Sequence, residues 1–375
     1  MKIMHVIHGL NMGGAETLIK EYAMNLNKEL FDVVILCFDH FKDSPYEKIL
    51  EKNRIKVIYV CDYMKFYNKK SLIFKIINHM QKYVLIRKFI HKETPDILHT
   101  HLSINKYIKF ARPKKGTKIF HTVHSEPQRL WNFNNKKSYR DFLSAKWLLK
   151  KYNMRFIVLH SKMQKEINSM FKTENAIILN NGIDLSKYNK KICMNKNEVR
   201  SELGIPQESF VLGHVGRFSK VKNHEFLVNV FNEVYKKNSN GFLLLVGDGS
   251  EKEKIKNLLH SLNLDNHYLI LSNREDIPNL LNAMDYFVFP SICEGLGISL
   301  IEAQEMDIPC FISEGVPEAT IISNIVTTLS LELCPNEWAK KILSYKIPQL
   351  IELNDSEWDI KETIKKLEKI YLNEL

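Results

Sequence analysis

The sequence predicts an α/β protein of two domains, each a parallel sheet wound with helices. Short apolar runs rich in Val, Ile and Phe alternate with longer amphipathic stretches, which is the pattern of βαβ units, and this pattern occurs twice. A chain of 375 residues is also too long for one ordinary core and suits two α/β domains.

The expected strands follow from the apolar runs. In the first half they are residues 2–7, 33–38, 56–60, 96–100, 118–123, 155–159 and 176–179. In the second half they are residues 210–215, 242–246, 268–271, 286–290 and 309–312. Beyond residue 330 we expect no strand, and the periodicity of residues 355–372 predicts an amphipathic helix.

A polar junction separates the two sets of strands. Asn181-Gly182 is typical of a turn, and the lysine-rich residues 186–201 follow it. We therefore expect a first domain at residues 1–185, a second at residues 186–354 and a terminal helix at residues 355–375.

Composition indicates a folded protein without a membrane-spanning segment. Hydrophobic residues make up 45% of the chain and charged residues 26%, which is enough to bury a core. No apolar run approaches the roughly 18 residues of a spanning helix, and the N-terminal run is too short for a signal peptide, so we expect a cytoplasmic protein. The six cysteines include no Cys-x-x-Cys pair and the histidines show no metal spacing, so we expect reduced thiols and no metal.

Charge differs between the two halves. Residues 1–185 carry a net charge of +17 and residues 186–375 one of −6. The basic half is expected to meet a polyanion, either an anionic bilayer or a nucleic acid. A nucleic acid is the less favoured partner, because we find no binding module and no strand face with interleaved aromatic and basic residues.

Residues 64–92 form a basic stretch without an acid. Apolar residues are interleaved with its basic ones, which are Lys65, Lys69, Lys70, Lys75, Lys82, Arg87, Lys88 and Lys92. This composition fits a basic amphipathic helix resting on an anionic membrane, at the inner face of the plasma membrane. It equally fits a core-packed helix with a solvated basic face, and both interpretations stay open.

Two strand-to-helix turns carry residues suited to phosphate. The first strand leads into Gly13-Gly14, where the backbone can approach a ligand and the helix start offers free N–H groups. The full Gly-x-Gly-x-x-Gly pattern is missing, so a dinucleotide is not expected. In the second half Gly216-Arg217 follows a strand, and Arg217 with Lys222 could clamp a diphosphate.

The most specific pattern lies in residues 287–303. An apolar strand is followed by Glu294, by two glycines that flank Leu296 and open a helix, and by Glu302 eight residues after Glu294. Glu294 can then lie over the helix start and accept hydrogen bonds from sugar hydroxyls, while N–H groups near Gly297 bind phosphate and Glu302 reaches a ribose. The alternative is that Glu294 only caps the helix.

The order and spacing of these motifs resemble family 4 glycosyltransferases, whose signature is Glu-x7-Glu. Further matching motifs are the Gly-Gly-Ala-Glu turn, Asn181-Gly182-Ile183-Asp184, Val246-Gly247-Asp248-Gly249 and Arg274-x-Asp276-Ile277-Pro278. Residues 213–225 and 285–304 are similar to enzymes of bacterial capsule and exopolysaccharide assembly. The resemblance implies the GT-B architecture: two Rossmann-like domains facing across a cleft, with the C-terminal helix packing back toward the first.

The resemblance also implies roles for single residues. Arg217 and Lys222 would hold the donor diphosphate, and Glu294 would act on the donor sugar as a catalytic residue. The donor-binding set is Gly13, Gly14, Arg217, Lys222, Arg274, Ile277, Leu296, Gly297, Ile298 and Glu302. His124 matches a histidine that lines the reaction centre, with sugar binding as its first role and catalysis as its second. His121, on the same strand, is expected to share the face of His124 and to be structural.

The implied reaction is retaining transfer of a sugar from a nucleotide sugar, with a UDP-sugar favoured, to a glycan or lipid-linked acceptor in bacterial surface polysaccharide synthesis. No Asp-x-Asp pair occurs in the sequence, so we expect a metal-independent enzyme without a cofactor, whose cations and helix dipoles neutralise the leaving group. A nucleotide-sugar epimerase or a phosphorylase on the same fold is the alternative.

Overall fold

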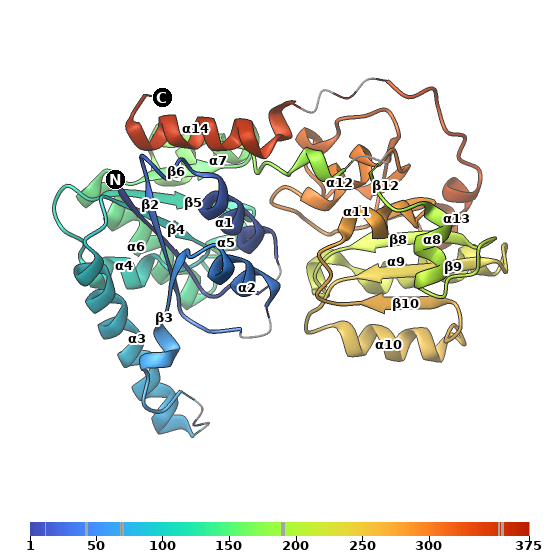
Figure 1. Cartoon of the computed structure of the whole chain (residues 1–375). Coiled ribbons are helices and arrows are strands. Elements are labelled where there is room, and N and C mark those ends of the chain that lie inside the picture. Colours follow the sequence, from blue (N-terminus) through green and yellow to red (C-terminus); the bar gives the residue numbers. More distant parts are fainter. Residues whose placement is uncertain are drawn as a thin grey trace. The chain divides into compact units, whose positions relative to one another are not determined.

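The computed structural model describes residues 1–11, 13–41, 44–67, 69, 71–188, 192–351, 353 and 356–374. Lys70 and the predicted boundary between residues 354 and 355 lie outside these residues. The chain divides into two compact units (Figure 1). The first unit contains residues 1–181 and the C-terminal helix from Lys361 on, and the second contains Gly182–Ile360.

The first unit is built on a seven-stranded sheet in the order β3-β2-β1-β4-β5-β6-β7. Every neighbouring pair in this sheet is parallel. Its strands are β1 (Lys2–Ile7), β2 (Asp32–Cys37), β3 (Lys56–Tyr59), β4 (Ile97–His101), β5 (Lys118–Thr122), β6 (Arg155–Val158) and β7 (Ala176–Ile178). The seven strands expected from the apolar runs of the first half are therefore all present, with ends that differ by a residue or two.

Helices connect these strands. They are α1 (Gly14–Asn25), α2 (Pro45–Lys52), α3 (Leu72–Glu93), α4 (Asn105–Ala111), α5 (Pro127–Leu130), α6 (Lys136–Tyr152) and α7 (Ser161–Phe171), with the 3-10 turn η1 (Val60–Tyr63). Helix α3 projects from the rest of the unit at its N-terminal end (Figure 1). Among the helices that the structure describes, none is both long and apolar enough to cross a bilayer.

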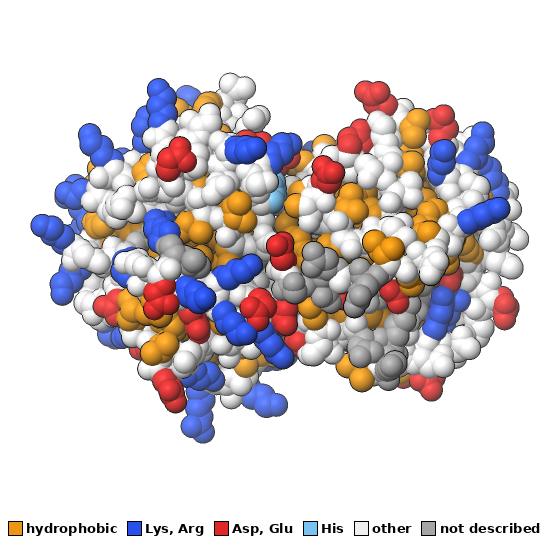
Figure 2. Space-filling model, turned by 90° about the horizontal axis from the view of Figure 1, so that it is seen from above, with side chains coloured by type: hydrophobic (Ala, Val, Ile, Leu, Met, Phe, Trp, Pro, Cys, Tyr) orange, Lys and Arg blue, Asp and Glu red, His pale blue; other side chains and the backbone are white. Residues whose placement is uncertain are grey.

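The last helix of the chain, α14 (Ile360–Leu372), completes the first unit. Its Tyr371 is fully buried, with its ring 5.3 Å from that of Phe120 and 6.0 Å from that of Phe31. Lys118 Nζ donates a hydrogen bond of 2.9 Å to the Tyr371 carbonyl. The C-terminal helix thus packs on the first sheet, as the resemblance implied. Lys and Arg side chains are spread over the face of this unit that Figure 2 shows.

The second unit contains a parallel six-stranded sheet in the order β10-β9-β8-β11-β12-β13. Its strands are β8 (Phe210–Val215), β9 (Gly241–Val246), β10 (Tyr268–Leu271), β11 (Tyr286–Phe289), β12 (Cys310–Ser313) and β13 (Val326–Leu329). The sequence analysis missed β13. This edge strand contains two threonines and only one buried residue, so it has no apolar run to mark it.

The helices of the second unit are short. They are α8 (Lys196–Glu202), α9 (His224–Tyr235), α10 (Lys252–Ser261), α11 (Ile277–Asn282), α12 (Ile298–Glu305) and α13 (Pro335–Leu343). The 3-10 turns are η2 (Leu185–Lys187), η3 (Lys220–Lys222), η4 (Glu318–Thr320) and η5 (Ser356–Trp358).

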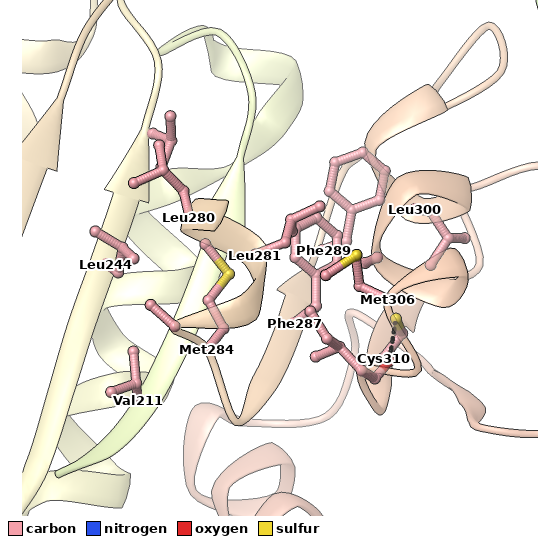
Figure 3. Packing of buried hydrophobic residues seen from close by; sticks show 14 of the residues in the cluster. Val211, Leu244, Leu280, Leu281, Met284, Phe287, Phe289, Leu300, Met306 and Cys310 are labelled. Atoms are coloured by element: carbon pink, nitrogen blue, oxygen red, sulfur yellow. Dashed lines mark hydrogen bonds between the residues drawn. The ribbon is translucent and has the colours of Figure 1, made fainter. Parts of the chain in front are cut away.

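Both faces of the second sheet are buried. On one face Leu244, Phe287 and Phe289 pack with Leu280 and Met284 (Figure 3). On the other face the alternate residues of the same strands pack against α9 and α13. A parallel sheet covered on both faces needs strands that are apolar throughout, which is why these strands could be recognised as continuous apolar runs.

Candidate functional site

In the second unit Arg217, Lys222 and Glu294 lie on the segments that follow β8 and β11. These two strands are neighbours in a parallel sheet, so their carboxyl ends and the loops behind them lie at the same edge. The Ile292 amide donates a hydrogen bond of 2.7 Å to the Val221 carbonyl and joins the two loops. Ligand-binding residues of open α/β sheets occupy this edge.

Lys222 and Glu294 meet where these loops join. Lys222 Nζ lies 2.9 Å from Glu294 Oε1, and the two side chains are only 17% and 10% exposed. The ammonium group also lies 4.4 Å from the ring centroid of Phe289. The lysine is therefore held between a carboxylate and an aromatic face, and both attract its charge. The motifs assigned these residues to different parts of a donor, and the structure places them in direct contact.

Glycines make this close packing of loops feasible. A Cβ atom at Gly216 would lie 3.3 Å from Lys222 Cε, so glycine leaves room for the lysine stem. Gly247, at the end of β9, has φ of +153°, and a Cβ atom there would lie 2.0 Å from the carbonyl oxygen of Gly216. The backbone that leads to Arg217 is thus shaped by two glycines on neighbouring strands. Arg217 itself is exposed.

Glu294 lies beside the N-terminus of α12. Gly297 caps this helix with φ of +88°, and its Cβ position lies 3.7 Å from Glu294 Cγ. The Glu294 amide donates a hydrogen bond of 2.9 Å to the Gly315 carbonyl, which fixes the loop. Leu296 is buried and Ile298 is the first helical residue. The arrangement places a carboxylate next to free N–H groups at a helix start, as the motif suggested.

Glu302 has a partner that the sequence analysis did not identify. The Tyr188 hydroxyl donates a hydrogen bond of 2.6 Å to Glu302 Oε1. Burial raises the pKa of Glu302, while this hydrogen bond and the charge of Lys222 oppose the shift. Tyr188 lies in the polar stretch after the domain junction, where no motif marks it.

Arg274 and Ile277 have their own contacts. Arg274 forms a two-pronged ion pair with Asp276, with Nε–Oδ1 and Nη2–Oδ2 distances of 2.7 and 2.5 Å. Hydrogen bonding to Arg274 lowers the pKa of Asp276. Ile277 begins α11 and packs against the apolar cluster on one sheet face. Binding a donor through Arg274 would therefore compete with Asp276.

The remaining predicted residues belong to the first unit. Gly13 is the N-cap of α1 and Gly14 its first residue, directly after the loop that follows β1. Thr17 donates to the Gly13 carbonyl through both its amide and its hydroxyl, at 2.8 and 2.9 Å. The glycine pair thus forms a strand-to-helix turn, as expected.

Histidines line one face of the first sheet. His99 and His101 are two residues apart on β4, so their side chains share a face. His5 on β1 is in register with His99, and Thr122 on β5 is in register with His101. His124 follows two residues after Thr122. Strand register therefore brings together side chains from three separate parts of the sequence.

Hydrogen bonds join these imidazoles. His5 Nδ1 lies 3.1 Å from His101 Nε2, and His101 Nδ1 lies 2.9 Å from His124 Nε2. His5 and His101 are fully buried, whereas His124 is half-buried. Burial lowers the pKa of His5 to about 3 and lowers the pKa values of His101 and His124, so all three are neutral at physiological pH.

His121 does not share the face of His124, which corrects the sequence-based expectation. His121 Nδ1 lies 2.8 Å from Thr100 Oγ1, and its ring packs 5.9 Å from that of Trp131, on the opposite side of the sheet from His101. Three positions separate His121 from His124, and side chains along a strand alternate between faces. The buried position of His121 fits the structural role that we expected.

One group of described residues could hold a metal ion. His5, His99 and His101 place one ligand atom each within 4.8 Å of one another. Both ring nitrogens of His99 are hydrogen bonded, to Tyr371 Oη at 2.5 Å and to Thr122 Oγ1 at 2.6 Å. A metal ion would have to displace such bonds and would bring charge into an interior without a carboxylate in this group. The set therefore fits hydrogen bonding better than metal binding.

Solved structures share the fold of this chain. The structure aligns with Anabaena HepE in complex with UDP and glucose over 100% of both chains, with a TM-score of 0.77 and 19% identity. It aligns with WaaG, a glycosyltransferase involved in lipopolysaccharide biosynthesis, over 98% of this chain and 99% of WaaG, with a TM-score of 0.73 and 16% identity. The fold is that of the GT-B enzymes, and the expected fold class is confirmed.

Sequence comparisons identify the family. A model described as Glycosyltransferase Family 4 matches residues 12–187, and one described as Glycosyl transferases group 1 matches residues 195–366. The chain therefore belongs to the glycosyltransferases, with a family 4 domain followed by a group 1 domain. It is 29% identical to the Escherichia coli UDP-Gal:alpha-D-GlcNAc-diphosphoundecaprenol alpha-1,3-galactosyltransferase over 89% of this chain and 84% of that protein. It is 27% identical to the Staphylococcus aureus capsular polysaccharide biosynthesis glycosyltransferase CapH, over 100% and 99%.

The close approach of Gly247 to Gly216 predicts that Gly247→Ala destabilises the second unit. The methyl group would overlap a backbone oxygen and the backbone angle would be strained, at a cost of about 3 kcal/mol. Gly204→Ala is the matched control, because Gly204 also has positive φ but has open space around its Cβ position. In urea unfolding, Gly247→Ala should lose much more of the free energy of unfolding than Gly204→Ala. Equal losses in the two variants would contradict the packing argument.

Buried neutral histidines predict a loss of stability in acid. The pKa of His121 is lowered to about 3 by burial, whereas in the unfolded chain it is about 6.5. The unfolded state therefore binds more protons below about pH 6.5, and stability falls as the pH falls. At about pH 5 this single group removes about 2 kcal/mol.

The variant His121→Phe isolates this contribution. As the pH is lowered from about 7 to about 5, the unmodified protein should lose about 2 kcal/mol of its free energy of unfolding that His121→Phe does not lose. The gap between the two free energies of unfolding should therefore close, or the variant should become the more stable protein. A gap that stays constant across this range would show that His121 is not buried as a neutral imidazole.

Proposed function

We propose that this glycosyltransferase moves a sugar from a UDP-sugar to a glycan or lipid-linked acceptor in the synthesis of a bacterial surface polysaccharide, with retention of configuration and without a metal ion. The observation that carries the proposal is the Lys222–Glu294 pair beside the N-terminus of α12. Support also comes from similar proteins: HepE was solved with UDP, and the name of the Escherichia coli relative specifies a UDP-sugar donor and a diphosphoundecaprenol-linked acceptor.

The pair suits a donor with a diphosphate next to a sugar. In this structure Glu294 neutralises Lys222. A diphosphate can take over that neutralisation, with Arg217 and the helix start as further partners, and this frees the carboxylate to accept hydrogen bonds from sugar hydroxyls. Glu302, held by Tyr188, is assigned to the ribose.

The reaction then depends on positioning and electrostatics. Arg217, Lys222 and the N-terminus of α12 stabilise the negative charge that develops on the leaving diphosphate. In front-face attack a donor phosphate oxygen accepts the proton of the acceptor hydroxyl, so the configuration at the sugar carbon is retained. His124 of the first unit is assigned to the transferred sugar, first as a hydrogen-bonding group.

Glu294→Gln tests the proposal. Glutamine keeps the shape of the side chain but loses its charge, so we expect turnover to fall about 100-fold. The assay incubates the protein with a panel of nucleotide sugars, with and without lipid-linked acceptors, and measures transfer and slow donor hydrolysis. A chelator should leave the rate unchanged, and NMR of the product should show the donor's anomeric configuration.

Glu253→Gln is the matched control, because Glu253, in the first turn of α10, also pairs with a lysine but is 77% exposed. Its turnover should equal that of the unmodified enzyme. Unchanged turnover in Glu294→Gln would remove Glu294 from the site. Formation of an epimerised nucleotide sugar without acceptor would support an epimerase instead. Sugar release that requires phosphate would support a phosphorylase instead.

We also propose that α3 docks on an anionic bilayer. Five of its apolar side chains, at helical spacing, are more than half exposed: Leu72, Ile73, Ile76, Met80 and Val84. The apolar side chains that this helix buries in the unit lie toward its C-terminal end and are Ile86, Phe89 and Ile90. Its basic residues, among them Lys75 and Arg87, complement anionic headgroups, and Glu93 at its end is its only acid.

Vesicle binding tests this surface. The double variant Ile76→Ser/Met80→Ser should bind phosphatidylglycerol vesicles at least about tenfold more weakly, because two large apolar groups no longer enter the interface. Ile347→Ser is the control, since Ile347 is equally exposed but lies in the second unit. Equal binding of the double variant and the control, or equal binding to neutral phosphatidylcholine vesicles, would contradict the proposal.

A further inference from the structure

A chain of three imidazoles runs from the interior of the first unit to His124. It begins at His5, passes through His101 and ends at the half-buried His124, with nitrogen–nitrogen distances of 3.1 and 2.9 Å. A fourth imidazole, that of His99, stacks on His101 with centroids 4.4 Å apart. His99 is itself held by hydrogen bonds to Tyr371 and Thr122, so its stacked ring restricts the orientation of the His101 ring.

The proton positions along this chain are linked. A neutral imidazole has one N–H donor and one bare nitrogen acceptor. Because both nitrogens of His101 are bonded to other imidazoles, only two arrangements satisfy both bonds. Either His101 donates to His5 and accepts from His124, or His5 donates to His101 and His101 donates to His124.

The surroundings of His5 favour the second arrangement. His5 Nε2 is buried without a hydrogen-bond partner in the part of the chain that the structure describes. The first arrangement would leave an N–H group there, and an unpaired buried N–H is rarer in proteins than an under-used acceptor. Tyr22, whose ring lies 5.9 Å from that of His5, has a buried hydroxyl that likewise lacks a partner among the described residues. The second arrangement leaves only a bare nitrogen at His5 Nε2 and is therefore favoured.

We propose that His5 and His101 are positioning residues that hold His124 in its Nδ1–H form. Nε2 of His124 accepts the hydrogen bond from His101, so its Nδ1–H group remains available as a donor to an oxygen of the transferred sugar. This inference rests on the proposed function, which assigns His124 to that sugar. It goes further by stating which tautomer binds and which residues select it.

Histidine-selective 15N labelling and NMR test the tautomer directly, without donor or acceptor. The unmodified protein should show His124 protonated at Nδ1. His5→Phe removes the first donor and should give a mixture of tautomers at His124. His5→Asn should restore the Nδ1–H form, because the asparagine amide can donate in place of Nδ1. His124 protonated at Nε2 in the unmodified protein, or an unchanged tautomer in His5→Phe, would overturn the proposal.

Two further variants keep the test decisive. His101→Asn retains a donor toward His124 without the link to His5, so the Nδ1–H form should persist even if His5→Phe fails to fold. His121→Phe is the matched control, because His121 is equally buried and also hydrogen bonded but lies on the other sheet face. It should leave the His124 tautomer unchanged, and a shift in this control would mean that the tautomer reports general damage.

Kinetics separate this inference from the proposed function. His5→Phe should lower kcat by about tenfold or more, the scale of losing a partner that orients a functional histidine, and His5→Asn should recover most of it. If the tautomer shifts as expected but neither variant changes sugar transfer, the positioning is correct and the role of His124 at the sugar is wrong. If transfer depends on His124 while its tautomer does not respond to His5, the positioning inference fails alone.

Discussion

The second unit depends on a charge pair that is costly unless both partners are present. Lys222 and Glu294 are mostly withdrawn from water, and removing one of them would leave the other as an uncompensated charge. Apolar residues of similar volume would stabilise such loops at least as well. In the proposed function the pair is a prepared set of charges at the sheet edge, where an anionic ligand exchanges with the carboxylate at little electrostatic cost.

The first unit differs from the second, because it buries polar histidine rings in its interior. His99 and His101 are fully buried on a strand between two others, and each of their nitrogens is hydrogen bonded. Desolvation keeps these rings neutral, and neutral rings can act as both donors and acceptors. The donor–acceptor direction of each hydrogen bond in this interior therefore determines the direction of the next. An apolar core could not provide such an order.

Much of the fold could be predicted from the sequence, because strands covered on both faces are apolar throughout, as in β9. The edge strand β13 escaped because its threonines interrupt that pattern. The turns at Gly13 and Gly297 were also predictable, since strand, glycine and helix follow one another in the sequence.

The contacts within the site were less predictable. Lys222 and Glu294 come from separate loops, and only the adjacency of β8 and β11 brings them together. The His-x-His pattern of β4 could have indicated that two histidines share one face of the sheet. The register that pairs His5 with His99, however, cannot be predicted from either segment alone. Local spacing also did not reveal that Arg274 is engaged by Asp276 two residues later.

The position of α14 has a consequence for the order of folding. Tyr371, near the end of the chain, reaches His99 in the first sheet, across a separation of 272 residues. During synthesis the first unit leaves the ribosome long before this helix exists, so it must wait for the whole second unit to be made before its last buried contacts can form. The N-terminal half therefore starts folding first but can be completed only after α14 has been synthesised.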